Sequence, residues 1–124
     1  PDEDLVQRID DGETHVTRVV MNRPKAYNAL SLELMSALQR TLDQIAEDQN
    51  VHVVVLEGAG KGFCAGHDLK ELRSDSSRQF YTLVFDTCCA LMARITTLPQ
   101  PVVAQVHGII GCCSVGVEEV LGLR

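Results

Sequence analysis

The residues best suited to chemistry stand together in the segment Phe63-Cys64-Ala65-Gly66-His67-Asp68-Leu69. Gly66 has no side chain, so a ligand could approach the backbone closely at this point. Asp68 and Glu71 have the spacing of a capping box, in which Asp68 caps a following helix and Glu71 reaches back to its start. The backbone N–H of His67 would then lie at a helix start, where it could hold a developing oxyanion. The His67 side chain could act as a general base, although a place in a pocket wall is the simpler expectation. An ordinary glycine loop before a capped helix is the alternative interpretation.

A second glycine-rich stretch, Gly58-Ala59-Gly60-Lys61-Gly62, does not fit the nucleotide-binding loops. A P-loop requires Ser or Thr directly after Gly-Lys, and Gly62 stands there. A dinucleotide fingerprint that starts at Gly58 requires its third glycine where Phe63 stands. Both nucleotide-binding interpretations are therefore excluded.

The elements that must position these residues follow from hydrophobic periodicity. A helix that begins after Ser31 carries Leu34, Leu38, Leu42 and Ile45 on one face and is expected to end near residues 48–50. The other predicted elements are strands at 5–9 and 15–21 joined by a turn at 10–13, a buried parallel strand at 51–56, a glycine-rich loop at 57–68, a helical turn at 69–73, a long amphipathic helix at 80–98 and a buried strand at 102–106. This order of strands and helices predicts an α/β domain.

Composition limits the classes of function. A chain of 124 residues forms one domain at most, and 45% hydrophobic residues fit a globular protein. The net charge of −6 argues against nucleic acid as a partner. The five cysteines lack CxxC spacing, so we expect reduced thiols in an intracellular protein and no metal site. No apolar run reaches the length of a membrane span.

Three segments together resemble the crotonase (enoyl-CoA hydratase/isomerase) superfamily, and the resemblance covers residues 5–110. They are Met21–Leu30, Ala65–Asp68 and Pro101–Gly108. The resemblance implies a crotonase-like (ClpP/crotonase) ββα spiral, of which this chain would hold only the N-terminal portion. Residues 1–110 would form the N-terminal part of an acyl-CoA-binding domain, and residues 111–124 a divergent C-terminal tail.

The resemblance also implies a site made largely of backbone groups. His67 matches the first oxyanion donor, and Cys113 falls at the second, where the expected glycine character is lost. The residues implied to contact coenzyme A are Lys25, Ala26, Tyr27, Ala29, Ala65, Gly66, His67, Asp68 and Leu69. Arg23, Lys25, Lys61, Lys70 and Arg73 would form a basic rim for the phosphates of coenzyme A, although any one of them alone is an ordinary surface charge. No cofactor is implied beyond the thioester itself, as substrate or ligand.

The tail departs from the family pattern. Gly116 stands where hydratases carry their first catalytic glutamate, Glu118 and Glu119 are out of register, and the second glutamate belongs to a segment that this sequence lacks. Water addition needs both an acid and a base, so we expect little or no hydratase activity from this chain. The family's contacts in homotrimers or hexamers would be largely missing too, and truncation would expose apolar faces and strand edges.

The function implied is that of an enoyl-CoA hydratase-like protein of fatty-acid metabolism. Three alternatives remain open: a catalytically silent acyl-CoA-binding or regulatory protein, a different crotonase reaction such as isomerisation or thioester hydrolysis, and a product that does not fold stably. The compartment implied is the mitochondrial matrix, or the cytoplasm for a bacterial chain.

Overall fold

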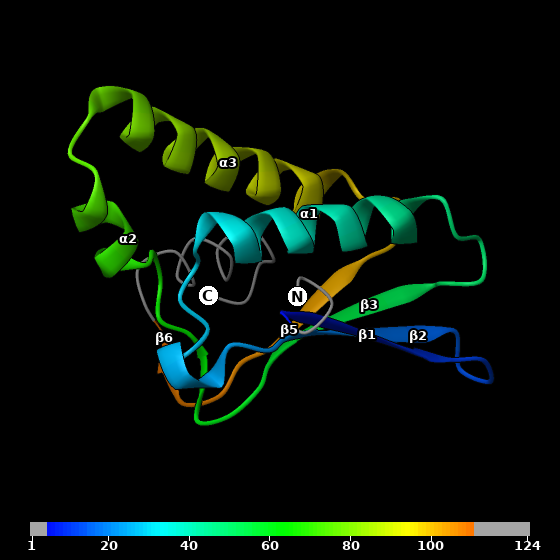
Figure 1. Ribbon diagram of the computed structural model, residues 1–124. Helices are drawn as coiled ribbons and strands as arrows, with labels where there is room; N and C mark the ends of the chain where they lie inside the picture. The colour runs from blue at the N-terminus through cyan, green and yellow to red at the C-terminus, as the bar shows by residue number, and fades with distance from the viewer. Residues whose placement is uncertain (1–4, 111–124) are drawn as a thin grey trace.

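The computed structural model describes residues 5–110, and the predictions made for Cys113, Gly116, Glu118 and Glu119 lie outside them (Figure 1). The elements are β1 (Val6–Asp11), β2 (Val16–Met21), the 3-10 helix η2 (Pro24–Ala26), α1 (Leu32–Ala46), β3 (Val53–Gly58), β4 (Gly62–Cys64), α2 (Leu69–Ser74), α3 (Arg78–Thr97), β5 (Val102–Gln105) and β6 (Ile109–Ile110). The predicted α/β class is confirmed.

Two sheets organise these strands. The larger has the order β1-β2-β3-β5, with β1 and β2 antiparallel and the β2–β3 and β3–β5 pairs parallel. The smaller sheet is the parallel pair β4–β6. In the turn between β1 and β2, the Asp11 carboxylate accepts hydrogen bonds from the N–H groups of Glu13 and Thr14. This turn lies after Asp11, slightly later than predicted, because β1 continues to that residue.

Helices α1 and α3 lie side by side on one side of the larger sheet, and α1 contacts β1 and β2 (Figure 1). Helix α1 begins as predicted, since the Ser31 hydroxyl accepts a hydrogen bond from the N–H of Leu34 at 3.1 Å. The four apolar residues predicted to share its inner face, Leu34, Leu38, Leu42 and Ile45, are all buried. Each such burial contributes about 1.5–3 kcal/mol, so this stripe is what fixes α1 against the sheet.

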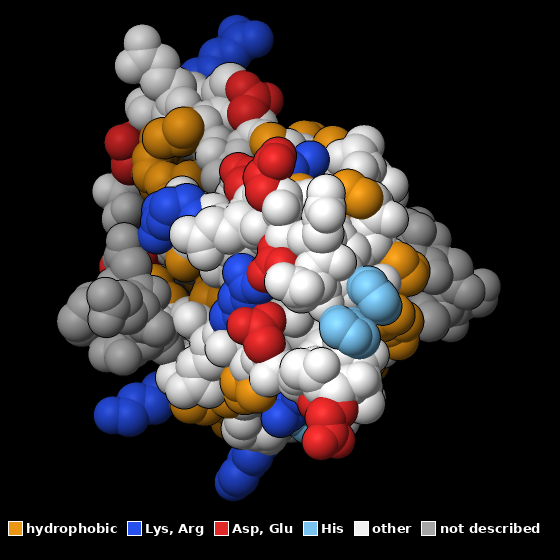
Figure 2. All heavy atoms as spheres, turned by 90° about the vertical axis from the view of Figure 1, so that its right-hand side faces the viewer, with side chains coloured by type: hydrophobic (Ala, Val, Ile, Leu, Met, Phe, Trp, Pro, Cys, Tyr) orange, Lys and Arg blue, Asp and Glu red, His pale blue; other side chains and the backbone are white. Residues whose placement is uncertain are grey.

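Surface ion pairs join elements around this core. Arg8 of β1 pairs with Asp48 at 2.7 Å, and Arg94 of α3 pairs with Asp43 of α1 at 2.8 Å. On the face shown in Figure 2, acidic and basic side chains are interspersed rather than gathered into a field of one sign. Pairs of this exposed kind contribute only about 0–1 kcal/mol each, so the apolar core carries the fold.

Three sequence expectations were wrong in detail. The loop predicted at 57–68 contains strand β4, because Phe63 is 1% exposed and its neighbours pair with β6 far along the chain. The strand predicted as buried at 102–106 leaves Val103 47% exposed, because β5 is the outermost strand of the described sheet. Helix α1 ends at Ala46 rather than at 48–50.

Candidate functional site

The two segments that the sequence analysis singled out run side by side, although nearly forty residues separate them. The Leu30 N–H donates to the Gly66 carbonyl at 2.7 Å, and the Asp68 N–H donates to the Leu30 carbonyl at 3.4 Å. A third bond joins the Ala65 N–H to the Tyr27 carbonyl at 2.9 Å. The loops at 22–31 and 57–69 therefore form one continuous surface.

The backbone N–H of His67 points away from this pairing. Leu30 and His67 form a parallel bridge in which the flanking groups, the Gly66 carbonyl and the Asp68 N–H, carry the bonds. In such a ladder the central residue turns its own N–H to the opposite side. Within residues 5–110 the His67 N–H has no acceptor. Gly66 precedes it at φ 92°, a conformation that glycine adopts without steric cost. The structure thus leaves this N–H without a partner in the described part of the chain, and its role in holding an anion stays a prediction.

The Asp68 carboxylate holds the two loops together. One oxygen accepts from the Glu71 N–H at 3.2 Å and caps α2 as predicted. The other lies 2.8 Å from Arg23 Nη1, which also donates to the Ala29 carbonyl at 3.0 Å. Burial alone would raise the pKa of Asp68, but the hydrogen bonds from Arg23 and from the Glu71 N–H outweigh it, so the pKa lies below the ordinary value. Arg23 was expected in the basic rim; in the structure its side chain is 31% exposed and its guanidinium is paired with the Asp68 carboxylate.

The second half of the predicted capping box was wrong, because Glu71 does not reach back to the start of α2. Its carboxylate oxygen Oε1 accepts a hydrogen bond from the N–H of Leu32 at 2.9 Å, so it reaches the first residue of α1 rather than the start of its own helix. A free N–H at a helix start needs such an acceptor, and a carboxylate there is favoured by the helix dipole. The carboxylates of Asp68 and Glu71, which follow His67 closely in the sequence, are therefore both engaged in holding structure.

Asn28 is the residue that sequence reasoning missed. Its side chain is fully buried, accepts from the Arg23 N–H at 2.8 Å, and donates to the carbonyls of Ala59 and Gly62 at 3.0 Å each. It thereby ties the first loop to the glycine-rich turn before β4. Its φ of 57° is a left-handed conformation that Asn tolerates better than most residues. An Asn a few residues after Arg-Pro was the available signal.

The other residues predicted to contact coenzyme A differ in how exposed they are and in whether their backbone groups are already bonded. Lys25 is exposed on η2, and Tyr27 and Leu69 are exposed at 43% and 60%. Ala29 is buried, and both its N–H and its carbonyl are already bonded within the loop. The remaining predicted rim residues, Lys61, Lys70 and Arg73, are exposed without ion-pair partners among residues 5–110.

The imidazole of His67 is partly buried against α3. The ring of Phe85 meets it edge-on, with centroids 5.0 Å apart and planes at 80°. Burial lowers the pKa of this histidine below its ordinary value. The nitrogen Nδ1 is buried and lacks a hydrogen-bond partner in the part of the chain that the structure describes. The ring thus lies against α3, and its predicted place in a pocket wall stays a prediction.

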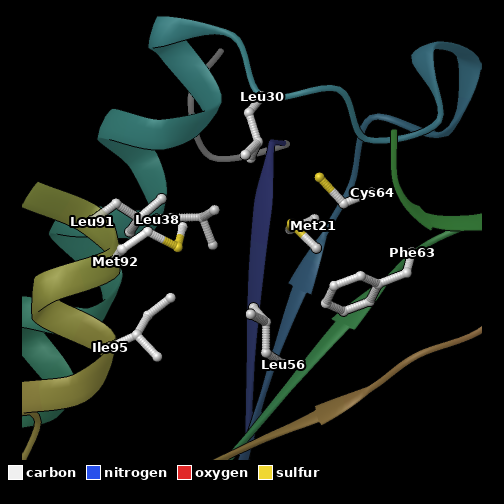
Figure 3. A pocket seen from close by; sticks show the side chains of 9 residues that line it. All are labelled: Met21, Leu30, Leu38, Leu56, Phe63, Cys64, Leu91, Met92 and Ile95. Carbon is white, nitrogen blue, oxygen red and sulfur yellow. The ribbon is translucent and has the colours of Figure 1, made fainter. Parts of the chain in front are cut away.

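An apolar cavity lies beneath this surface, between the helices and the sheets (Figure 3). Its volume is about 20 Å³, and its lining comprises Met21, Leu30, Leu38, Leu56, Phe63, Cys64, Leu91, Met92 and Ile95. A water needs roughly 10–15 Å³ and several polar partners, which this lining does not offer, so we expect the cavity to be dry. At this volume it is too small for an acyl chain.

Within residues 5–110 no group of three His, Cys, Asp or Glu side chains has the arrangement of a metal site. The helices of this described part are also too short or too polar to cross a bilayer.

The ion pair of Asp68 predicts a pH-dependent stability. Because the folded pKa lies below the ordinary 3.8, the carboxylate stabilises the fold above that pH, and this contribution is lost as the pH falls through the folded pKa. The gap in free energy of unfolding between wild type and Asp68→Asn should therefore be full at neutral pH and shrink below about pH 4. Urea titrations over this range measure the gap. Asp86→Asn, on the exposed side of α3, is the control, and a gap independent of pH would contradict the prediction.

The hydrogen bond between Glu71 and the Leu32 N–H predicts different losses of stability for two substitutions of Glu71. Glu71→Ala removes the acceptor of the Leu32 N–H and is expected to lower the free energy of unfolding by about 1 kcal/mol, as for loss of a helix cap. Glu71→Gln keeps an oxygen there and should lose much less. Thermal and urea denaturation measure both, with Glu13→Ala as an exposed control. Equal losses for Ala and Gln would show that the acceptor is unimportant.

The family model described as Enoyl-CoA hydratase/isomerase matches residues 16–118. The chain is 38% identical over 94 residues to enoyl-CoA hydratase domain-containing protein 3, mitochondrial, of Xenopus laevis, an alignment that covers 76% of this chain and 32% of that protein. The chain thus spans about a third of the length of this curated relative.

Solved structures extend the likeness to the fold. An enoyl-CoA hydratase of Mycobacterium smegmatis superposes with a TM-score of 0.85 at 45% identity, over 91% of this chain and 45% of that one. Human enoyl-CoA hydratase domain-containing protein 3 superposes with a TM-score of 0.86 at 28% identity, over 94% and 45%. The predicted crotonase-like fold is confirmed for the portion that this chain spans, which is less than half of each solved protein.

Proposed function

The chain belongs to the enoyl-CoA hydratase/isomerase family, and on that premise we propose that it binds an acyl-CoA thioester across the adjoining loops 22–31 and 57–69. The observation that carries the proposal is the His67 backbone N–H, which has no acceptor within residues 5–110 and faces away from the Leu30 pairing. A thioester oxygen is the acceptor that this N–H suits, because charge builds on that oxygen when the thioester reacts. The second donor of the proposal is the backbone N–H of Cys113.

The coenzyme A part of the ligand would lie along the first loop and the turn beside it. The contacts proposed are those of Lys25, Ala26, Tyr27 and Ala29, with Ala65 to Leu69 opposite. Four basic side chains are exposed and available to phosphate: Lys25, Lys61, Lys70 and Arg73. Arg23, in contrast, is paired with the Asp68 carboxylate. Ala29 would contribute mainly shape, since its backbone groups are already bonded.

We further propose that the activity is enoyl-CoA hydratase-like and serves fatty-acid metabolism, and that this chain alone hydrates enoyl-CoA slowly or not at all. Hydration needs a free acid and a free base beside the thioester. Among residues 5–110, the two carboxylates that follow His67 in the sequence are engaged: Asp68 with Arg23, and Glu71 with the Leu32 N–H. The mitochondrial name of the Xenopus relative supports the mitochondrial matrix as the compartment, while a bacterial chain, like the Mycobacterium one, would act in the cytoplasm.

The test of this proposal removes the backbone N–H of His67. Replacing His67 by its α-hydroxy acid analogue turns the amide at residue 67 into an ester, which keeps the side chain and deletes the N–H. We expect crotonyl-CoA to bind the unaltered chain saturably and to raise its melting temperature. The ester is expected to weaken this binding about tenfold, the worth of one good hydrogen bond.

A chromophoric cinnamoyl-CoA adds a readout of carbonyl polarisation, because its absorption moves to longer wavelength when the thioester oxygen is hydrogen-bonded. The same ester placed at Leu83, an exposed position inside α3, is the control for backbone damage. Absence of binding by the unaltered chain would refute the proposed function. Binding that the His67 ester leaves unchanged would refute the role of this N–H.

A further inference from the structure

We propose that the imidazole of His67 is a second ligand-binding group of this site: a neutral ring that carries its proton on Nε2 and donates it to an oxygen of the bound thioester ligand. The identity of the ligand rests on the proposed function above. The state of the ring does not, because it follows from the surroundings of its two nitrogens.

The buried nitrogen decides where the proton sits. Nδ1 of His67 is buried and has no partner among residues 5–110. A proton on Nδ1 would bury an unsatisfied N–H, which is the rarest kind of orphaned group in folded proteins. A neutral imidazole carries one proton, so a bare Nδ1 places it on Nε2. The tautomer with an Nε2–H donor is therefore the one that this packing favours.

The same packing disfavours the charged ring. An imidazolium would carry protons on both nitrogens and would bury an unpaired Nδ1–H. Within residues 5–110 the contacts of the ring offer no compensating anion: Asp68 is occupied by Arg23 and by the Glu71 N–H, and the ring that faces His67 from α3 is the uncharged Phe85. The lowering of the His67 pKa by burial agrees with this. A neutral imidazole can serve as a hydrogen-bond donor to developing negative charge.

The remaining nitrogen is free to meet a ligand. Nε2 is not among the buried unpaired atoms, and it has no hydrogen-bond partner within the described part of the chain. The residue is only partly buried and Nδ1 is its buried end, so the exposed part of the ring is taken to include Nε2. Bond lengths place Nε2 within roughly 6 Å of the backbone nitrogen of the same residue. A second ligand oxygen, in crotonyl-CoA the pantetheine amide carbonyl nearest the thioester, can therefore contact Nε2–H while the thioester carbonyl contacts the backbone N–H.

The contact with Phe85 keeps the ring in place. Its edge-on approach from α3 is one of the preferred arrangements of aromatic pairs. Since α3 is fixed against α1 by the core, the imidazole plane is set by rigid elements rather than by the loop alone. The donor is thus oriented before a ligand arrives, which reduces the entropy lost on binding.

The first test is nitrogen NMR of the full chain with ¹⁵N-labelled histidine. His67 is expected to show a bare Nδ1 and a protonated Nε2 at neutral pH. His15 is the internal contrast: its Nδ1 lies 2.9 Å from the Asn50 carbonyl, so it must carry its proton on Nδ1. A protonated Nδ1 at His67, in either the neutral or the charged ring, would overturn the inference.

The second test measures ligand affinity in two variants. His67→Phe keeps an aromatic ring against Phe85 and keeps the backbone N–H, and we expect it to bind crotonyl-CoA about three- to tenfold more weakly. His67→Gln restores an N–H donor on the side chain and should recover part of the loss. The cinnamoyl-CoA absorption shift should persist in His67→Phe, because the backbone N–H remains.

The outcomes separate this inference from the proposed function. If the wild-type chain does not bind crotonyl-CoA, the proposed function fails and the ligand contact fails with it. If wild type binds and His67→Phe binds equally well, only the role of the imidazole fails. A weakening in His67→Phe without recovery in His67→Gln would also overturn it, since packing rather than donation would then explain the loss.

Discussion

Replacing Asn28 by alanine is expected to lower the free energy of unfolding by about 3 kcal/mol, because three backbone groups, one buried and two partly buried, lose their partners at once. The groups are the Arg23 N–H and the carbonyls of Ala59 and Gly62. The side chain is fully buried, so water cannot replace it without rearrangement. Alanine also fits the left-handed φ of 57° less well than asparagine.

Two further substitutions separate these causes. Asn28→Gly accommodates the positive φ and isolates the loss of hydrogen bonds. Asn28→Asp keeps the acceptor for the Arg23 N–H but sets a carboxylate against the carbonyls of Ala59 and Gly62, so it should be at least as destabilising. Urea denaturation measures all three, with the exposed Asn50→Ala as the matched control. A loss for Asn28→Ala no larger than that for Asn50→Ala would contradict the argument.

Gly58→Ala is expected to destabilise the protein by about 3 kcal/mol, within the upper range for overpacking. A Cβ at this position would overlap the Phe63 carbonyl oxygen and come within 2.8 Å of both the Gly62 carbonyl oxygen and Asn28 Nδ2. Two of these atoms are backbone, which cannot rotate away as the end of a flexible side chain would. The strand β3 and the turn before β4 must therefore separate to admit one methyl group.

Gly12→Ala is the matched control, because nothing lies within 4 Å of a Cβ built there. Thermal and urea denaturation compare the two variants with wild type, and we expect Gly12→Ala to change stability by less than about 0.5 kcal/mol. Gly58→Ala should also weaken acyl-CoA binding beyond its effect on stability, since it displaces the turn that Asn28 anchors. Equal effects of the two glycine substitutions would show that the turn is not closely packed.

The roles of Asn28 and Gly58 could not be predicted from the sequence, whereas other features could. The helices were predictable because their signals are local: Ser31 precedes α1, and the apolar stripe of α1 repeats every three or four residues. Strand β4 was not predictable, because three residues carry no periodicity and their pairing partner, β6, lies far along the chain. Asn28 has no periodicity, the preceding Arg-Pro is only a weak signal, and its role depends on the turn at residues 59–62, far along the chain.

The polar network of the site illustrates the same limit. From the sequence, Arg23 was a candidate phosphate contact and Glu71 the second half of a local cap. In the structure Arg23 pairs with Asp68, and Glu71 accepts from the Leu32 N–H. A charged side chain can satisfy its hydrogen bonds with any group within reach, so its partner is set by which elements come together. The position of the His67 N–H was predictable only as a turn before a helix.

The sequence by itself determined the α/β class, the limits of α1 and α3 to within a few residues, the cap at Asp68 and the segment that carries His67. These depend on contacts within a few residues, for which spacing along the chain is the physical cause. Only the tertiary structure decided that the loops at 22–31 and 57–69 lie side by side and that Asn28 joins them. It also decided that the carboxylates of Asp68 and Glu71 are bonded to Arg23 and to the Leu32 N–H. Those facts depend on contacts between segments about forty residues apart, which form only when the core brings the segments together.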